Sequence, residues 1–197
     1  MVRKKRNNNR REEILDTTMR VLAFEGDASV TMRSIADRVG IRLSSLQYYF
    51  PTRRELLKHT IEKCIGSEVR KLDEMSHRSK LEPKKLLHRE LKIHLSVSRD
   101  PFVSKFFAAL WALATHDNEA EDLLNEVYER DCQRYTALIQ RANPKLLKKT
   151  CEHRATLIVA QLEGLVLFIS PGKLRASKVR VIEKELSRLI DKAIISS

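Results

Sequence analysis

A glycine near the start of the chain separates two short amphipathic segments, and this spacing restricts the fold more than any other feature. The stretch reads VTMRSIADRVGIRLSSLQYYF over residues 30–50. Thr31 is suited to cap the first helix, and Gly40 can take the positive φ of a tight turn. Small or apolar residues stand in the register that packs two such helices together: Ile35, Ala36, Val39, Gly40, Ile41, Leu46 and Tyr49. Two short helices joined in this way are typical of a DNA-reading helix-turn-helix.

The polar side chains of the second helix are suited to contact DNA. With Leu46 and Tyr49 turned inward, five residues remain on its other sides: Arg42, Ser44, Ser45, Gln47 and Tyr48. Their side chains can hydrogen-bond base edges or phosphate oxygens. Leu43 fits two roles equally, contact with a thymine methyl group or burial beside Leu46. The alternative for the whole segment is a polar surface helix without a ligand.

Basic residues near this segment predict phosphate contacts. Arg33, at the start of the first helix, and Arg53, at the start of the helix after Pro51, are candidates to clamp phosphates on either side. Arg54 is instead expected to pair with a nearby carboxylate. Residues 1–11 hold six cations and no acid, and we expect an unstructured arm. Three of its residues are further candidate DNA contacts: Lys4, Lys5 and Arg6.

The charge of the whole chain favours an anionic partner. The formal net charge is +12 and the sequence pI is about 9.8, which suits nucleic acid or an acidic membrane surface. The first residues lack the apolar run of a secretory signal, and no apolar stretch of about 18 residues or more suggests a membrane span. We therefore expect a cytoplasmic protein without a membrane partner.

Apolar residues at helical spacing continue to the end of the chain. They predict helices over residues 10–25, 31–39, the stretch after Gly40, 52–79, from Pro83, from Pro101, 118–141, 146–169 and 175–195. Strand-like alternation and internal repeats are missing. The expected fold class is all-α with about nine helices.

The sequence predicts no cofactor, no metal and no catalytic centre. Cys64, Cys132 and Cys151 are odd in number and far apart, which favours neither a disulfide framework nor a zinc site. The histidines include no HxxxH pair that could chelate a metal. An all-helical enzyme is the alternative, and it is disfavoured because the motifs GxSxG, GxGxxG and HExxH do not occur.

The first sixty residues resemble the TetR-type (tetracycline-repressor) family of bacterial transcription regulators. The resemblance rests on RREEILDTTMRVLAFEG at residues 10–26 and VTMRSIADRVGIRLSSLQYYFPTRRELL at residues 30–57. Three positions depart from the family pattern: Arg42 replaces a capping serine, Gln47 replaces a tyrosine, and Arg53 replaces a lysine. Because Gln47 replaces the tyrosine expected to bind phosphate, we assign that contact to Tyr48.

The resemblance implies a homodimeric repressor that reads an inverted-repeat operator in double-stranded DNA. It implies a helix-turn-helix domain over residues 1–55 and a helical ligand-binding and dimerisation domain over residues 56–197. Expected contacts to a small-molecule effector come from the middle helices: His94, Phe107, Trp111, Tyr128 and Gln161, with Tyr135 and Glu163 as further candidates. Expected dimer contacts come from the last two helices: Leu157, Gly164, Leu165, Phe168, Ile182 and Leu186.

Two alternatives remain open for the second domain. The apolar run at residues 155–169 could be core within one chain, because helices that are apolar on every side are simply buried. The protein could also regulate transcription without a small-molecule effector, under the control of its abundance or of a protein partner.

Overall fold

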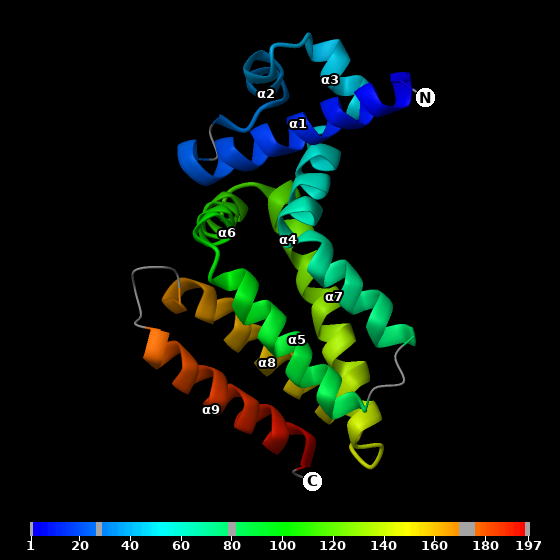
Figure 1. Ribbon diagram of the computed structural model, residues 1–197, viewed down its shortest axis with the longest axis vertical. Coiled ribbons are helices and arrows are strands. Elements are labelled where there is room, and N and C mark those ends of the chain that lie inside the picture. The colour runs from blue at the N-terminus through cyan, green and yellow to red at the C-terminus, as the bar shows by residue number, and fades with distance from the viewer. Residues whose placement is uncertain (1, 27–28, 79–81, 170–175, 196–197) are drawn as a thin grey trace. The chain divides into compact units, whose positions relative to one another are not determined.

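The computed structural model describes the backbone of residues 2–26, 29–78, 82–169 and 176–195, and the side chains of 9–26, 29–65, 82–168 and 177–192. In these ranges it contains nine helices and no strand (Figure 1). The helices are α1 (Val2–Glu25), α2 (Met32–Val39), α3 (Leu43–Tyr49), α4 (Arg53–Arg78), α5 (Pro83–Ser98), α6 (Pro101–Ala114), α7 (Asn118–Ala142), α8 (Lys148–Ile169) and α9 (Ala176–Ile195). This confirms the predicted all-α fold.

Side-chain caps and prolines set where the helices begin. Four side-chain oxygens accept hydrogen bonds from N–H groups of the first helical turn: those of Thr31, Thr52, Asp100 and Asp117, at 2.8–3.1 Å. Such caps satisfy backbone donors that have no partner within the helix. Pro83 and Pro101 stand at the first position of α5 and α6, where a missing N–H costs nothing.

The prediction of an unstructured amino-terminal arm is wrong, because α1 begins at Val2 and continues through the arm without a break. Lengthening a helix costs far less than starting one, and Ile14 and Leu15 hold the following turns in the core. Lysine and arginine are also good helix formers, so the cationic turns extend a helix that packing has already started. The side chains of Lys4, Lys5 and Arg6 lie outside the described residues, and their contact with DNA stays a prediction.

The chain divides into two compact units, each made of two segments that are not consecutive in the sequence. Unit 1 consists of Met1–Gly66 and Lys105–Leu124, and unit 2 consists of Ser67–Ser104 and Asn125–Ser197. Three helices, α4, α6 and α7, therefore begin in one unit and end in the other. The predicted division of functions between residues 1–55 and 56–197 stays a prediction, because compactness does not reveal function.

Unit 1 has a core built on its first three helices. α2 packs against α1 and α3. Apolar side chains on one face of each of these helices and of the start of α4 are almost completely buried, among them Ile14, Leu22, Ile35, Leu46 and Leu57. These residues recur at three- and four-residue spacing within each helix, which is why one face of each helix enters the core.

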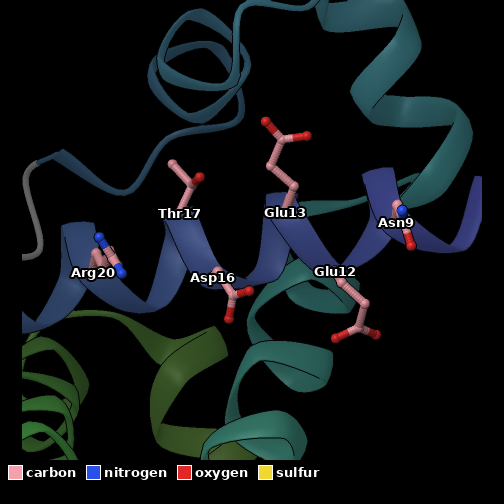
Figure 2. Close-up of a pocket in the computed structure, with 6 residues that line it drawn as sticks. All are labelled: Asn9, Glu12, Glu13, Asp16, Thr17 and Arg20. Atoms are coloured by element: carbon pink, nitrogen blue, oxygen red, sulfur yellow. The ribbon is translucent and has the colours of Figure 1, made fainter. Parts of the chain in front are cut away.

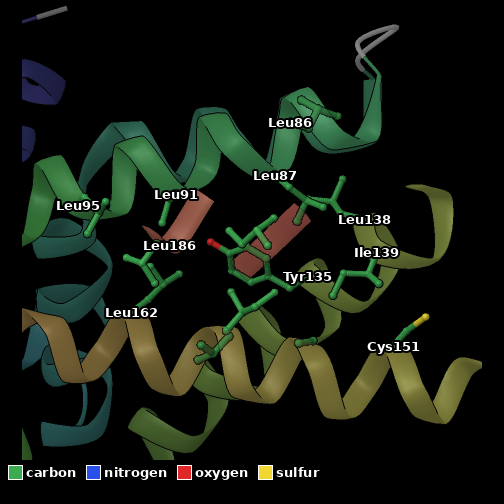
Figure 3. Close-up of a cluster of buried hydrophobic side chains, with 14 of the residues drawn as sticks. Leu86, Leu87, Leu91, Leu95, Tyr135, Leu138, Ile139, Cys151, Leu162 and Leu186 are labelled. Atoms are coloured by element: carbon green, nitrogen blue, oxygen red, sulfur yellow. The ribbon is translucent and has the colours of Figure 1, made fainter. Parts of the chain in front are cut away.

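Unit 2 has a second core, to which α5, α7, α8 and α9 contribute. Tyr135 of α7 lies in it with only 1% of its surface exposed, and Figure 3 shows leucines of α5 and α8 around its ring. α8 buries Cys151, Ala155 and Leu162 on one side. Its other side exposes Leu157 and Phe168. The apolar run at residues 155–169 is therefore only partly buried by its own chain.

The turn between α2 and α3 leads to a first prediction. Gly40 has φ 70°, in the left-handed region, and an added methyl group there would meet no atom within 4 Å. Gly40→Ala should therefore lower the free energy of unfolding by about 1–2 kcal/mol through backbone strain alone. Gly40→Asn should cost less, because asparagine tolerates this conformation. Urea unfolding measures both, and equal losses would argue against backbone strain as the cause.

Candidate nucleic-acid interface

The turn at Gly40 sets the direction in which α3 leaves α2. Thr31 caps α2 by accepting the Ser34 N–H at 3.1 Å. At the other end the N–H groups of Gly40 and Ile41 donate to the carbonyls of Asp37 and Ala36, at 3.1 and 3.0 Å. These bonds close the helix with a left-handed glycine, as in a common helix ending. α3 begins three residues later, in the arrangement expected of a helix-turn-helix.

Two buried side chains hold α3 with its polar sides outward. Leu46, in the middle of the helix, and Phe50, directly after it, have no exposed surface. Tyr49 is half-buried, and its ring meets that of Tyr48 edge-on at 5.3 Å between centroids. Leu43 is also half-buried, so its two predicted roles both remain open. The residues predicted to contact DNA from this helix and its N-cap are all exposed: Arg42, Ser44, Ser45, Gln47 and Tyr48.

Tyr48 is a largely exposed aromatic side chain on this surface. Its exposed fraction is 73%, although a tyrosine ring ordinarily favours burial. Arg42 occupies the N-cap position of α3 without making a side-chain cap. A guanidinium has no acceptor atom with which to cap backbone N–H groups, and that of Arg42 stays available to a phosphate or a guanine.

The arginines around α3 differ in what they already bind. Among the described residues, neither Arg33 nor Arg42 makes an ion pair, and both are exposed. Arg38 pairs with Glu25. Arg54 lies 3.5 Å from Asp122, which confirms that it pairs with a carboxylate. Arg53 was predicted to bind phosphate, but it contacts two carboxylates within unit 1.

The amino-terminal part of α1 lies beside the end of α3 (Figure 1). The guanidinium carbon of Arg11 is 5.0 Å from the centroid of the Phe50 ring, a distance at which a cation is attracted to an aromatic face. Phe50 is also the C-cap of α3. The cationic first turns of α1 therefore begin close to α3, the helix that carries Gln47 and Tyr48.

A groove along α1 is lined by acidic and polar side chains. It has a volume of about 490 Å³ and is lined by Asn9, Glu12, Glu13, Asp16, Thr17 and Arg20 (Figure 2). Lys63 Nζ lies 2.7 Å from carboxylate oxygens of both Glu12 and Asp16, and Arg10 pairs with Glu13 at 2.8 Å. Each of the three carboxylates is therefore paired with a cation, unlike the exposed hydroxyls, amide and arginine of the α3 face. The groove is therefore separate in chemistry from the face formed by α3.

The predicted effector contacts divide between the two units. Phe107 and Trp111 lie in unit 1, with ring centroids 6.4 Å apart. His94, Tyr128 and Gln161 lie in unit 2. Tyr128 is half-buried against the core, whereas Gln161 is exposed on the outer side of α8. As effector contacts, all five stay predictions.

Unit 2 contains a buried group of charges that we did not predict. The guanidinium of Arg134 lies 3.0 Å from Glu90 and 3.1 Å from Asp131, and all three side chains are almost fully buried. The sequence could have indicated Glu90, because this charged residue interrupts the apolar stripe formed by Leu86, Leu87 and Leu91. A charge on the buried stripe of a helix needs a buried partner.

Next to this group, burial shifts the pKa values of two side chains in opposite senses. His94 Nε2 is buried without a hydrogen-bond partner among the described residues and lies 3.8 Å from Glu163 Oε1. Burial, helped by the positive charge of Arg134, lowers the pKa of His94 to about 4. Burial, helped by the negative charge of Asp131, raises the pKa of Glu163 to about 7. Both groups are therefore favoured in their neutral forms.

The predicted dimer contacts have different exposures. Leu157 and Phe168 are each 64% exposed. Gly164, Leu165 and Ile182 are half-buried. Leu186 is 7% exposed and belongs to the core of unit 2, so its side chain is already used within its own chain.

No helix in the described part of the chain has the length and hydropathy to cross a membrane. Among the described side chains, no group of three or more His, Cys, Asp or Glu residues could hold a metal ion.

The raised pKa of Glu163 predicts a pH dependence of stability. A carboxyl whose pKa is higher in the folded state stabilises the fold at low pH, and this contribution is lost as the pH rises from about 4.5 to about 7. Over this range the wild-type protein should lose about 2 kcal/mol of unfolding free energy relative to Glu163→Gln. The comparison isolates Glu163, because His94 is present in both proteins. Glu152→Gln, on the exposed side of α8, is the control, and urea unfolding at several pH values is the measurement. Parallel curves for wild type and Glu163→Gln would contradict the burial of this carboxyl.

Comparison with known proteins identifies the family. Residues 14–60 match the family model of the bacterial regulatory proteins of the tetR family. The chain is 29% identical over 126 residues to the HTH-type transcriptional regulator in the dhlA 5′ region of Xanthobacter autotrophicus. It is 25% identical over 130 residues to the HTH-type transcriptional repressor KstR of Mycobacterium tuberculosis. Each alignment covers 61% of this chain, and they cover 61% and 57% of the two relatives.

Solved structures share the fold along nearly the whole chain. A TetR-family regulator from Rhodococcus sp. superposes with a TM-score of 0.72 at 19% identity, covering 94% of this chain and 99% of that one. A transcriptional regulator from Saccharomonospora viridis, solved in complex with choline, has a TM-score of 0.66 at 20% identity, covering 93% and 96%. The family model matches the residues that build the exposed face of α3. Residues 14–60 thus form a helix-turn-helix domain of the TetR family of transcriptional regulators, a family that is not enzymatic.

Proposed function

We propose that the protein is a ligand-responsive repressor that binds an inverted-repeat operator in double-stranded DNA as a homodimer. One observation carries the proposal. α3 is held by two fully buried side chains, Leu46 and Phe50, while Ser44, Gln47 and Tyr48 are exposed. A short helix with this division of side chains suits the major groove, where serine and glutamine read base edges and tyrosine binds phosphate.

Electrostatics supports DNA as the partner. Arg33 and Arg42 are exposed and make no ion pair among the described residues. Arg11 of α1 lies over the ring of Phe50, next to α3. Each phosphate that such a side chain neutralises releases bound counterions and strengthens association. As a bacterial DNA-binding protein, it would act in the cytoplasm.

The outer faces of α8 and α9 support a dimer. Leu157, Gln161, Gly164 and Phe168 recur at three- and four-residue intervals on one side of α8, with Leu157 and Phe168 largely exposed. On α9, Val181 and Leu189 are 61% and 47% exposed. Apolar surface of this kind on two neighbouring helices favours association with a copy of itself. A two-fold dimer would place two copies of α3 about 34 Å apart, one turn of DNA.

A small-molecule effector is supported more indirectly. One structural relative has been solved with choline. The buried charges of unit 2 are a place where a polar ligand could form hydrogen bonds in a low-dielectric interior. A ligand changes DNA affinity only if it binds the two conformations with different affinity, and a shift from 1:99 to 99:1 requires about 5.5 kcal/mol.

The DNA-binding part of the proposal predicts the outcome of a selection from random duplex DNA. The protein should enrich an inverted repeat whose half-sites lie about 10 base pairs apart, centre to centre. Gln47→Ala should change the preferred half-site with a discrimination loss of about 1–3 kcal/mol, without a change in helix content by circular dichroism. Gln140→Ala, which removes an exposed glutamine from α7, is the matched control. Enrichment of no sequence, or of a site without two-fold symmetry, would contradict the proposal.

The dimer part predicts the effect of charge on the outer face of α8. Leu157→Glu should produce monomers in analytical ultracentrifugation and weaken operator binding at least tenfold, because a buried unpaired carboxylate opposes association. Leu147→Glu is the control, since Leu147 is 75% exposed but precedes α8. A Leu157→Glu protein that remains a dimer would move the interface to another surface.

A further inference from the structure

One arginine of unit 1 is occupied in a way that the family resemblance does not suggest. Arg53, the first residue of α4, uses all three nitrogen atoms of its guanidinium. Nε donates to the carbonyl of Val30 at 3.1 Å, Nη2 lies 2.8 Å from Asp117 Oδ2, and Nη1 lies 3.1 Å from Glu119 Oε2. The side chain is 23% exposed. Its fork of donors therefore already faces protein acceptors on each side.

These contacts join three segments that are far apart in the sequence. Val30 is buried and directly precedes Thr31, the cap of α2. Asp117 caps α7 by accepting the Ala120 N–H at 2.9 Å, and Glu119 lies in the first turn of that helix. Arg53 thus connects the entry to the helix-turn-helix with the turn between α6 and α7, all within unit 1.

The electrostatic state of Asp117 agrees with a maintained contact. Burial acts to raise the pKa of Asp117, but the Ala120 N–H and the Arg53 guanidinium outweigh it and hold the pKa below its ordinary value. The carboxylate is therefore ionised at neutral pH, and its bonds to arginine are charge-assisted. A DNA phosphate would have to displace Asp117 and Glu119 from Arg53 and then lie beside two negative charges.

The neighbouring residue, Arg54, makes a more exposed contact with a carboxylate than Arg53 does. Arg54 lies 3.5 Å from Asp122, and the two side chains are 36% and 67% exposed. Exposed pairs of this kind contribute little to stability. The planar fork of Arg53 can bind two carboxylates and a carbonyl together, whereas a lysine offers one compact charge.

We propose that Arg53 is a positioning residue, and that its contacts with Asp117, Glu119 and Val30 hold the helix-turn-helix in its DNA-binding orientation from the α6–α7 turn. On this proposal Arg53 contributes to operator affinity without touching phosphate. It rests on the proposed DNA-binding function and revises the role that Arg53 has in it. It also names the α6–α7 turn as a point from which DNA binding can be weakened without any change on the DNA-facing surface.

The test compares two double variants, each of which replaces two acidic residues in α7 or in the turn before it with their amides. Asp117→Asn/Glu119→Gln removes both carboxylates from Arg53, while asparagine can still cap α7. Glu121→Gln/Asp122→Asn removes the same charge from exposed positions nearby. If Arg53 positions the helix-turn-helix, the first pair should weaken binding to the selected operator about tenfold, and the second should leave it unchanged or strengthen it. If Arg53 bound phosphate, losing the competing carboxylates would strengthen binding, which would overturn the proposal.

Two variants of Arg53 separate the same alternatives by salt dependence. Arg53→Ala should lower affinity while keeping the slope of log K against log [salt], because no phosphate contact is lost. A phosphate contact would reduce that slope by about 0.9 per subunit. Arg53→Lys should bind as weakly as Arg53→Ala, since one ammonium group cannot replace the fork. Wild-type affinity in Arg53→Lys would contradict the positioning role.

Hydrogen exchange without DNA tests the contact even if no operator is found. Amides of residues 31–49 should exchange several times faster in Asp117→Asn/Glu119→Gln than in wild type, as expected when a restraint on local opening is removed. Glu121→Gln/Asp122→Asn should exchange like wild type. Unchanged exchange in the first pair overturns the positioning role, whereas absent DNA binding by wild type overturns the proposed function alone.

Discussion

The burial of Leu46 and Phe50 is the constraint on which the proposed DNA-facing surface depends. Both side chains are completely covered, so α3 cannot rotate about its axis without exposing large apolar groups to water. The left-handed turn at Gly40 brings α3 to this position, because the chain reverses within a few residues of the end of α2. The exposure of Gln47 and Tyr48 follows from what is buried on the opposite side. The exposed face of α3 is thus a consequence of core packing.

Some basic side chains of unit 1 pair with carboxylates of the same unit, and others are exposed without an ion pair among the described residues. Arg38 and Arg53 bind carboxylates within the unit, and Lys63 lies between Glu12 and Asp16. Arg33 and Arg42 have no ion pair among the described residues. A net charge of +12 therefore overstates how many cations can meet an anionic partner. The free side chains, and not the total charge, set where a polyanion is attracted.

Unit 2 combines an apolar core with charges that need one another. Glu90 and Asp131 are both paired with Arg134, and removing the arginine would leave two buried carboxylates without a cation. His94 and Glu163 lie at the edge of this group and are neutral near pH 6. The outer sides of α8 and α9 expose apolar side chains, among them Leu157, Phe168 and Val181. One unit thus holds both a polar interior and a surface suited to association.

Local patterns in the sequence were sufficient to predict the helices, the cap at Thr31, the glycine turn and the outward side chains of α3. These depend on residues within a few positions of one another, where backbone sterics and helical spacing decide the outcome. The same local view failed for the amino-terminal arm, because helix growth from a packed segment reaches beyond the packed residues. Only the tertiary structure decided that Arg53 meets Asp117 and Glu119, that Glu90 meets Arg134, and that Leu186 is core. Charged side chains choose partners by distance in space, and that distance is set by the packing of segments remote in sequence.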